Sequence, residues 1–295
     1  MSLLEILGRR VLLLDGAMGT ELMRAGLEPG RSPDSWNLER PDAVRDIHRR
    51  YFEAGSDLVV TNTFGATPLK LSAYGLGDRC REINRAGALL LGAVRPAGRF
   101  IGGDIGPTGK FLKPQGEFNE SQFEEAFAEQ AEALAAGGVD AFFIETMYDL
   151  REALCALRAC VSVSTLPVFA TLTFNRTPRG FFTLMGDSPA KCLRALEEAG
   201  AAAAGANCTL DSADMADLVQ IMSDVTRLPL IAQPNAGRPE VAPGGAVAYS
   251  QGLEDYVRHF PRIVDNGARL IGGCCGTTPE TIRRLSELTA ARQGA

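Results

Sequence analysis

The sequence predicts a single (β/α)8 barrel, or TIM barrel, that occupies residues 1–295. Short aliphatic runs without a helical stripe alternate along the whole chain with longer amphipathic segments rich in Ala, Leu, Glu and Arg. This alternation, with short connections, indicates a parallel sheet covered by helices, and eight such units close into a barrel. A length of 295 residues is ordinary for one domain of this class.

The eight predicted strands are short and rich in aliphatic residues. They are Val11–Leu14, Leu58–Thr61, Phe100–Gly103, Ala141–Ile144, Val168–Leu172, Ala202–Ala206, Leu230–Ala232 and Leu270–Gly272. The sixth is assigned by its place in the alternation, because Ala201–Ala204 has helical propensity and little β-branching.

Amphipathic segments between and after these strands predict the helices. They are Ala43–Ala54, Leu69–Val94, Ser121–Ala136, Leu150–Val161, Pro189–Ala199, Ser212–Thr226, Leu253–Asp265 and Pro279–Ala291. Gly55 and Gly200 each follow a helical pattern, as expected of C-cap glycines in the left-handed conformation. Ser188-Pro189 pairs an N-cap hydroxyl with a proline at the first helical position. The segment Ala236–Gly252, rich in Gly, Pro and Ala, is predicted to be a long loop.

Composition and charge exclude several classes of partner. A net charge of −6, with no dense cluster of Lys and Arg, disfavours nucleic acid. The apolar runs near the N-terminus are too short for a secretory signal or a membrane span, so we expect a cytoplasmic protein without a membrane partner. In that reducing compartment the seven cysteines are not expected to form disulfides, which leaves metal binding or burial.

Polar residues and glycines follow each predicted strand, at the barrel end that carries function in this fold. These segments are Asp15–Thr20, Thr61–Gly65, Asp104–Gly109, Glu145-Thr146, Thr173-Phe174, Asn207–Thr209, Gln233–Gly237 and Cys274–Gly276.

Three cysteines differ from the other four in position. Cys208, Cys274 and Cys275 come just after strands six and eight, which lie near each other in a closed barrel. Zn²⁺ binds thiolates tetrahedrally, and three protein ligands would leave one position for a substrate. Burial as small apolar residues is the alternative, and spacing alone leaves both open. The remaining cysteines, Cys80, Cys155, Cys160 and Cys192, lie in helical patterns and are interpreted as core residues.

Three carboxylates at the same barrel end are candidates for binding an ammonium group. Asp15, Asp104 and Glu145 would offer anionic partners, although each could equally stabilise its own loop. Gly16 would let a ligand approach the backbone closely, or simply permit a tight turn. His48 and His259 both lie in predicted helices, so we expect a site that works without histidine.

The motifs together resemble the homocysteine S-methyltransferase family, with the closest likeness to the homocysteine-binding barrel of cobalamin-dependent methionine synthases. The likeness spans essentially the whole chain and is carried by Asp15–Thr20, Thr61–Phe64, Gly106–Gly109, Glu145-Thr146, Gly205–Cys208, Pro234–Gly237 and Gly273–Gly276. Gln233 departs from the pattern, because relatives often carry a basic or small residue there.

The resemblance implies a zinc-dependent enzyme that methylates homocysteine to methionine. Cys208, Cys274 and Cys275 would bind Zn²⁺, and the thiol of homocysteine would take the open position. Asn235 matches an asparagine able to lend zinc an oxygen when substrate is absent. The amino-acid end of the substrate would lie against Asp15, Gly16 and Glu145, with Thr63 and Asp104 nearby.

The resemblance also frames the choice of methyl donor. A chain of 295 residues has no room for the additional domains of cobalamin-dependent methionine synthase, so we expect methylcobalamin on a separate corrinoid protein to supply the methyl group. The alternatives are an enzyme that uses S-methylmethionine or betaine, and a non-catalytic barrel whose cysteines bind zinc structurally or sense redox state.

Overall fold

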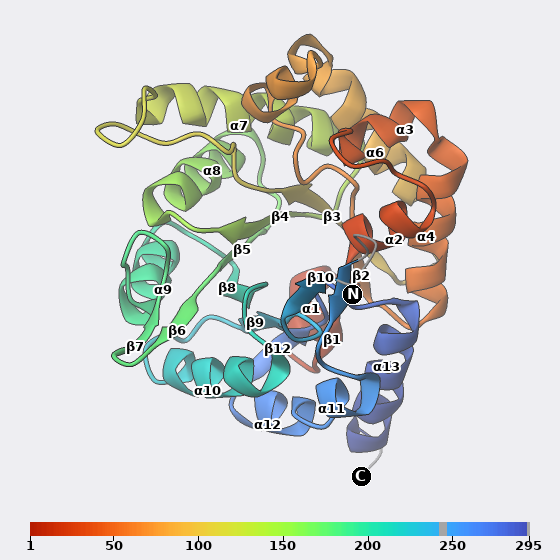
Figure 1. The fold of residues 1–295 in the computed structure, drawn as a ribbon, viewed down its shortest axis with the longest axis vertical. Helices are drawn as coiled ribbons and strands as arrows, with labels where there is room; N and C mark the ends of the chain where they lie inside the picture. Colours follow the sequence, from red (N-terminus) through yellow and green to blue (C-terminus); the bar gives the residue numbers. More distant parts are fainter. Residues whose placement is uncertain (242–246, 294–295) are drawn as a thin grey trace.

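Eight parallel strands form a ring at the centre of the molecule, with helices packed around its outer face (Figure 1). The computed structural model describes residues 1–241 and 247–293. The ring strands are β1 (Leu12–Leu13), β2 (Leu58–Val60), β3 (Phe100–Ile105), β4 (Ala141–Met147), β5 (Val168–Leu172), β8 (Ala203–Asn207), β9 (Leu230–Gln233) and β12 (Ala268–Ile271). Each predicted strand overlaps one of these, so the predicted (β/α)8 barrel is confirmed.

The outer layer consists of helices that follow the strands in sequence. They are α4 (Pro41–Glu53), α6 (Cys80–Gly92), α7 (Glu120–Ala136), α8 (Leu150–Val163), α9 (Pro189–Glu198), α10 (Ser212–Ser223), α11 (Leu253–Val257), α12 (Phe260–Asp265) and α13 (Pro279–Gln293). Within the described ranges, no helix is both long enough and apolar enough to span a bilayer.

Two of the predicted helices were wrong in extent. The segment Leu69–Val94 contains most of α5 (Pro68–Leu71), two short 3-10 turns and then α6. The break lies at Gly75, which adopts the left-handed conformation with φ 70° and ends the first 3-10 turn. The segment Leu253–Asp265 is divided into α11 and α12 by a turn at Arg258-His259, with Pro261 in the first turn of α12.

Several elements were not predicted. Helix α1 (Leu3–Leu7) begins with a capping box between Ser2 and Glu5, and its Leu3 and Leu7 pack into the barrel interior. Two hairpins, β6 (Asn175–Thr177) with β7 (Gly180–Phe182) and β10 (Pro239–Val241) with β11 (Val247–Tyr249), were also missed. Short helices α2 (Met18–Arg24) and α3 (Trp36–Glu39) precede α4. Part of the predicted loop Ala236–Gly252 is therefore a hairpin, and its residues 242–246 lie outside the described ones.

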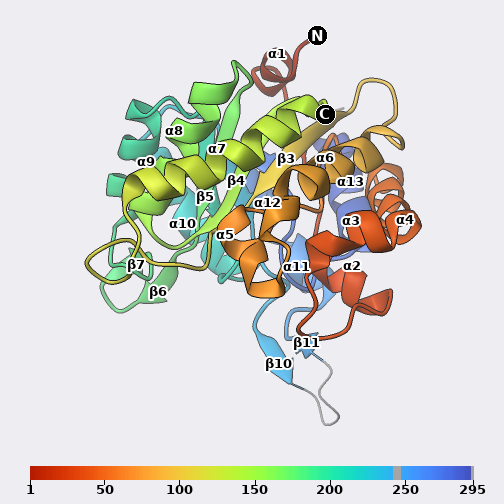
Figure 2. The same ribbon diagram turned by 90° about the horizontal axis from the view of Figure 1, so that it is seen from above.

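The two ends of the barrel differ in character. Helix α1 covers the end at which the strands begin, and the hairpin β10–β11 projects from the opposite end, where they finish (Figure 2). The interior between them is filled by inward-facing side chains that include Leu14, Phe143, Phe169 and Ile231. The ring therefore has no open channel at this level, and in this fold ligands bind above the core, at the carboxyl ends of the strands.

The strand order runs β1-β12-β9-β8-β5-β4-β3-β2, so the seam of the ring lies between β1 and β2. Side chains contribute to closing it. The Asp57 carboxylate accepts a hydrogen bond from the Leu13 N–H at 3.0 Å, and the Asp15 carboxylate accepts one from the Val60 N–H at 2.9 Å. Asp15 therefore belongs both to the seam and to the barrel end that carries function.

Candidate active site

A cavity of about 400 Å³ opens at the carboxyl ends of the barrel strands. Barrel enzymes bind their substrates at this end, where the strand-to-helix loops converge. Seven residues that were predicted from the sequence line it: Asp15, Gly16, Asp104, Glu145, Cys208, Cys274 and Cys275. The fold thus gathers into one cavity residues that lie at or just after the carboxyl ends of five different strands.

The three predicted cysteines form a cluster. The sulfurs of Cys208 and Cys275 are 3.9 Å apart, and all three sulfurs lie within 4.8 Å of one another. Cys208 follows β8 and the other two follow β12, the strands on either side of β9. The N–H groups of Cys208 and Cys274 donate to the carbonyls of Gln233 and Pro234, so the segment ending β9 holds both loops in place. Cys208 has a φ of 61°, which is uncommon outside glycine.

The cluster concentrates negative charge on one sulfur. Hydrogen bonds from the thiols of Cys274 and Cys275 lower the pKa of Cys208 to about 3. The hydrogen bond with Cys208 raises the pKa of Cys275 to about 12. The three sulfurs therefore favour one thiolate and two thiols, and a soft cation that displaced the two protons would meet three thiolates. This donor set fits a tetrahedral Zn²⁺ with one position left open.

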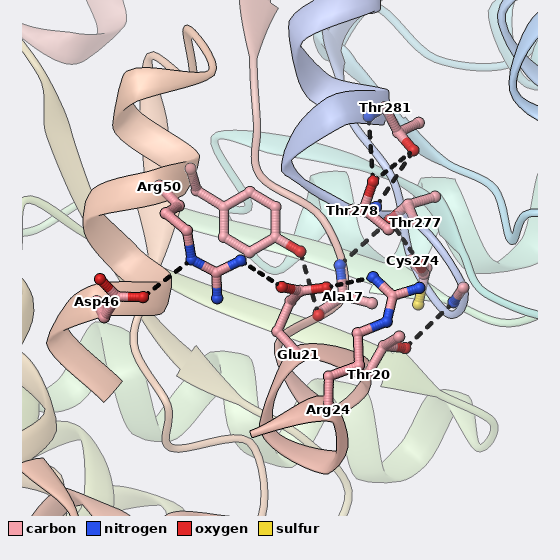
Figure 3. A network of polar contacts seen from close by, with 12 residues as sticks. Ala17, Thr20, Glu21, Arg24, Asp46, Arg50, Cys274, Thr277, Thr278 and Thr281 are labelled. Atoms are coloured by element: carbon pink, nitrogen blue, oxygen red, sulfur yellow. Dashed lines mark hydrogen bonds and ion pairs between the residues drawn. The ribbon is translucent and has the colours of Figure 1, made fainter. Parts of the chain in front are cut away.

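A hydrogen-bond network ties the loop after β12 to the loop after β1 (Figure 3). The Thr277 hydroxyl donates to the Cys274 carbonyl at 2.7 Å and accepts from the Ala17 N–H at 3.2 Å. Helix α2 follows the loop after β1, and its Glu21 pairs with Arg50 of α4 at 2.7 Å. The position of Cys274 thus depends on contacts that extend to the first helices of the barrel.

Asn207 connects the thiols to a carboxylate and was missed as a site residue in its own right. It is fully buried at the end of β8. Its Oδ1 accepts hydrogen bonds from the Thr171 hydroxyl and the Thr146 N–H, both at 2.8 Å. Its Nδ2 donates to Glu145 at 3.3 Å and approaches the Cys274 sulfur at 3.8 Å. Its place immediately before a cysteine at a strand end was the available signal.

Asn235 and Gln233 carry buried oxygens without a hydrogen-bond partner. The two residues are 5% and 3% exposed, and neither Asn235 Oδ1 nor Gln233 Oε1 has a partner among the described residues. The Asn235 side chain also makes a hydrogen bond to Cys208 that lowers the pKa of the thiol, and Gln233 lines the cavity. A buried oxygen without a partner is costly, and such atoms are informative about missing ligands.

Burial, joined at Glu145 and Asp104 by mutual repulsion, raises the pKa of all three predicted carboxylates. Burial raises the pKa of Asp15 to about 7. Burial, and then the charges of Asp15 and Cys208, raise the pKa of Glu145 to about 8. Burial and the charge of Glu145 raise the pKa of Asp104 further above its usual range. An ammonium group bound among them would compensate their negative charge and favour their ionisation.

The replacement Asp15→Asn is expected to stabilise the empty protein at high pH. In the folded protein the pKa of Asp15 is about 7, whereas its ordinary value is 3.8. As the pH rises, the unfolded chain therefore loses the Asp15 proton first, and the stability of the wild type falls between about pH 4 and pH 7. Asparagine does not titrate, so the variant does not lose this stability. Each unit by which folding raises the pKa of Asp15 corresponds to about 1.4 kcal/mol of the wild-type loss. Thermal unfolding near pH 4 and pH 8 measures the difference. An Asp42→Asn control is apt because the Asp42 side chain is 87% exposed, and equal pH profiles for all three proteins would contradict the expectation.

Of the two remaining predicted residues, Thr63 lies behind the cavity wall and Gly16 is part of it. Thr63 is fully buried and is not one of the residues that line the cavity. Its hydroxyl donates to the Asp104 carbonyl at 2.8 Å, so it supports the strand end that carries this carboxylate. At Gly16 a Cβ atom would come within 2.6 Å of the Thr277 hydroxyl, which explains the glycine in this turn.

The remaining cysteines and histidines lie away from the cavity. Cys80, Cys155, Cys160 and Cys192 are all buried, as predicted. His48 is 1% exposed, and burial lowers its pKa to about 3, whereas His259 lies in the turn between α11 and α12. Neither histidine is a residue that lines the cavity.

The fold and the site together define a barrel enzyme whose cavity combines a thiol cluster with buried carboxylates. The model of the family described as homocysteine S-methyltransferase matches residues 12–289. The chain therefore belongs to the homocysteine S-methyltransferase family, a family of methyltransferases.

Individual relatives agree with this assignment. The chain is 34% identical over 308 residues to methionine synthase of Mycobacterium leprae, and 33% identical over 314 residues to that of Mycobacterium tuberculosis. Each alignment covers 98% of this chain and 25% of the relative, so the chain spans about a quarter of their length. Among solved structures, the oxidised and metallated forms of the homocysteine methyltransferase MmuM from Escherichia coli share the fold. Their TM-scores are 0.81 and 0.78, at 24% identity, and each comparison covers 96% of this chain and 98% of MmuM.

Proposed function

We propose that residues 1–295 form a homocysteine-binding domain that transfers a methyl group to the thiol of homocysteine and so forms methionine. The observation that carries the proposal is the presence of three thiols and three buried carboxylates in one cavity. The two groups match the two ends of an amino-acid thiol, and family membership supports the same substrate.

Cys208, Cys274 and Cys275 would hold a Zn²⁺ ion in this proposal. The spacing of their sulfurs and the preference of Zn²⁺ for thiolates support this choice. When bound, zinc would lower the pKa of a coordinated thiol, so that a thiolate nucleophile is available at neutral pH. The unpartnered Oδ1 of Asn235 is suited to approach the metal when substrate is absent.

In this proposal the carboxylates of the cavity, and the residues that position them, bind and orient the substrate. Asp15 and Glu145 accept hydrogen bonds from the substrate ammonium, and Asp104 adds negative charge beside them. Asn207 holds Glu145 in place through its Nδ2 group. Gly16 keeps the turn after β1 close to the cavity without a side chain that would fill it. The hydrogen bond from Val60 fixes the Asp15 carboxylate, so the ammonium meets a pre-positioned acceptor.

The proposed methyl donor is methylcobalamin held by a separate corrinoid protein that docks at the cavity end of the barrel. The identity to methionine synthases over a quarter of their length supports a donor module outside residues 1–295. S-Methylmethionine and betaine are the alternative donors, and a non-catalytic zinc or redox barrel is the alternative role. The alternative donors and a structural zinc would use the same three cysteine ligands.

Supplying each donor separately tests the proposal. Purified zinc-loaded protein is incubated with homocysteine and with methylcobalamin, S-methylmethionine or betaine, and methionine is measured. We expect methionine from methylcobalamin, with a higher rate when a methylated corrinoid protein carries it. Methionine from S-methylmethionine or betaine alone would overturn the donor assignment and keep the methyltransferase. No methionine from any donor would favour the non-catalytic role.

A further inference from the structure

Thr277 is a fully buried polar residue where two loops that line the cavity meet. The loop after β12 carries the thiols of Cys274 and Cys275, and the loop after β1 consists of residues 14–17. These two strands are neighbours in the ring, so the loops that follow them lie side by side. Thr277 does not itself line the cavity. Any effect that it has on a bound metal or substrate must therefore pass through these loops.

The Thr277 hydroxyl bridges the two loops (Figure 3). It donates a hydrogen bond to the Cys274 carbonyl at 2.7 Å and accepts one from the Ala17 N–H at 3.2 Å. A carbonyl can only accept and a backbone N–H can only donate, so the direction of both bonds is fixed. The Thr277 N–H donates to the same Cys274 carbonyl at 3.1 Å. The backbone of a proposed metal ligand is therefore restrained by one side chain, and through it by the loop after β1.

A glycine from each loop makes room for this side chain. A Cβ atom on Gly16 would lie 2.6 Å from Thr277 Oγ1, and a Cβ atom on Gly273 would lie 2.5 Å from Oγ1 and 2.6 Å from Cγ2. Neither glycine has a φ in the left-handed region, so the backbone conformation does not require glycine at these positions. The space occupied by Thr277 requires it. The packing of Thr277 thus reaches the residues next to Asp15 and Cys274.

The loop after β1 is also held from the side of the outer helices. The Tyr51 hydroxyl of α4 donates to the Ala17 carbonyl at 3.1 Å, and Tyr51 is 1% exposed. Ala17 therefore has its N–H bonded to Thr277 and its carbonyl bonded to the helix layer. Because this loop is anchored in the barrel, the Thr277 hydroxyl transmits a fixed position to the backbone of Cys274.

We propose that Thr277 is a positioning residue whose hydroxyl holds Cys274 in place against the loop after β1. It would thereby set the metal affinity of the thiol cluster and the span between the metal and Asp15. The inference rests on the proposed function and deepens it. A ligand whose backbone is already fixed loses less freedom when the metal binds, so the hydroxyl raises metal affinity. An amino-acid thiol must reach the metal and Asp15 at once, so a shift of Cys274 also weakens substrate binding.

Thr277→Val tests the hydroxyl, because valine has nearly the shape of threonine and lacks the oxygen. The affinity for Zn²⁺ is measured by competition with a chelator, in the absence of homocysteine. We expect Thr277→Val to bind Zn²⁺ about ten- to a hundredfold more weakly, the usual loss when an outer contact of a metal ligand is removed. The visible absorption of the Co²⁺-loaded protein should also change, because it reports the geometry around the metal. Thr277→Ser, which keeps the hydroxyl, should restore both.

Binding of homocysteine is measured separately by calorimetry, with zinc at saturation and without a methyl donor. Thr277→Val should bind homocysteine more weakly than the wild type, and Thr277→Ser should bind it as the wild type does. Thermal unfolding of the metal-free proteins shows whether each variant is folded. If Thr277→Val does not fold, Thr277→Ala takes its place with the same expected losses.

Thr281→Val is the matched control. Thr281 is 7% exposed in α13, and its hydroxyl bonds with Thr278 rather than with Cys274 or Ala17. This control should lower thermal stability and leave the binding of zinc and homocysteine unchanged. Equal losses in Thr281→Val, or a Thr277→Ser protein no better than Thr277→Val, would overturn the proposal.

Two outcomes separate this inference from the proposed function. If the wild type binds zinc and homocysteine and Thr277→Val binds both equally well, with the same Co²⁺ absorption, the role of Thr277 is wrong and the proposed function stands. If the wild type binds neither zinc nor homocysteine, both proposals are wrong.

Discussion

Replacing Cys208 with Ser is expected to reduce bound zinc from about one ion per chain to near zero while the barrel remains folded. The substitution removes one of three thiolates from a cluster in which the sulfurs lie within 4.8 Å of one another. A catalytic metal contributes several kcal/mol, so methionine formation should fall by roughly a thousandfold or more. Metal analysis, circular dichroism and the homocysteine assay measure the three quantities on one preparation.

Cys192→Ala is the control for loss of a cysteine as such, because Cys192 is fully buried in α9 and not part of the cluster. It should lower stability and leave the zinc content unchanged. A Cys208→Ser protein that keeps its zinc and its activity would contradict the proposed ligand set. A variant that loses zinc and unfolds would instead favour a structural metal. Cys208 lies in a partly exposed loop after β8, which is why we expect the fold to survive.

The barrel was predictable because its strands and helices each carry a local signal. The weakest strand, β8, illustrates the limit of that signal. Its alanines suggested a helix as much as a strand, yet a Cβ on Gly205 would come within 2.0 Å of the Ile231 carbonyl on β9. The small residues therefore reflect close packing against the neighbouring strand. Such packing is a tertiary effect that periodicity cannot reveal.

The elements missed were short or depended on distant contacts. Helix α1 is only five residues long, and the packing of Leu3 and Leu7 into the barrel stabilises it. Hairpin β6–β7 begins with Asn175–Thr177, three exposed residues without an apolar alternation. The long helix predicted over Leu69–Val94 ignored the left-handed Gly75. In each case local composition was ambiguous and the three-dimensional context decided.

The candidate site divides in the same way. The cysteines and carboxylates could be predicted because each is an unusual residue directly after a strand. Lys70, which also lines the cavity, could not be predicted, since a lysine in a helical segment ordinarily faces solvent. Its cavity position follows from packing against Gly65 and Gly109, which belong to different loops. Thr63 was predicted beside the substrate, but its hydroxyl turns to the Asp104 carbonyl.

The barrel seam was invisible in the sequence and carries the second large prediction. Asp57→Ala is expected to lower the free energy of unfolding by about 3 kcal/mol, the lower range for breaking a buried ion pair. The Asp57 side chain is 6% exposed and binds Arg10 at 2.7 Å, Arg99, and the Leu13 N–H. Because the two arginines are about one-third exposed, solvent screens part of the effect. Urea unfolding gives the measurement.

Two further variants separate the ion pairs of Asp57 from its hydrogen bond with the Leu13 N–H. Asp42→Ala removes a carboxylate that pairs with Arg45 and is 87% exposed, and it should change stability by less than about 1 kcal/mol. Asp57→Asn retains an oxygen for the Leu13 N–H but removes the charge, so its loss should be intermediate. If Asp57→Ala cost no more than Asp42→Ala, the seam would not depend on this side chain. A large loss confined to Asp57→Ala would instead assign the closure of β1 against β2 to the backbone hydrogen bond, because the asparagine keeps that bond alone.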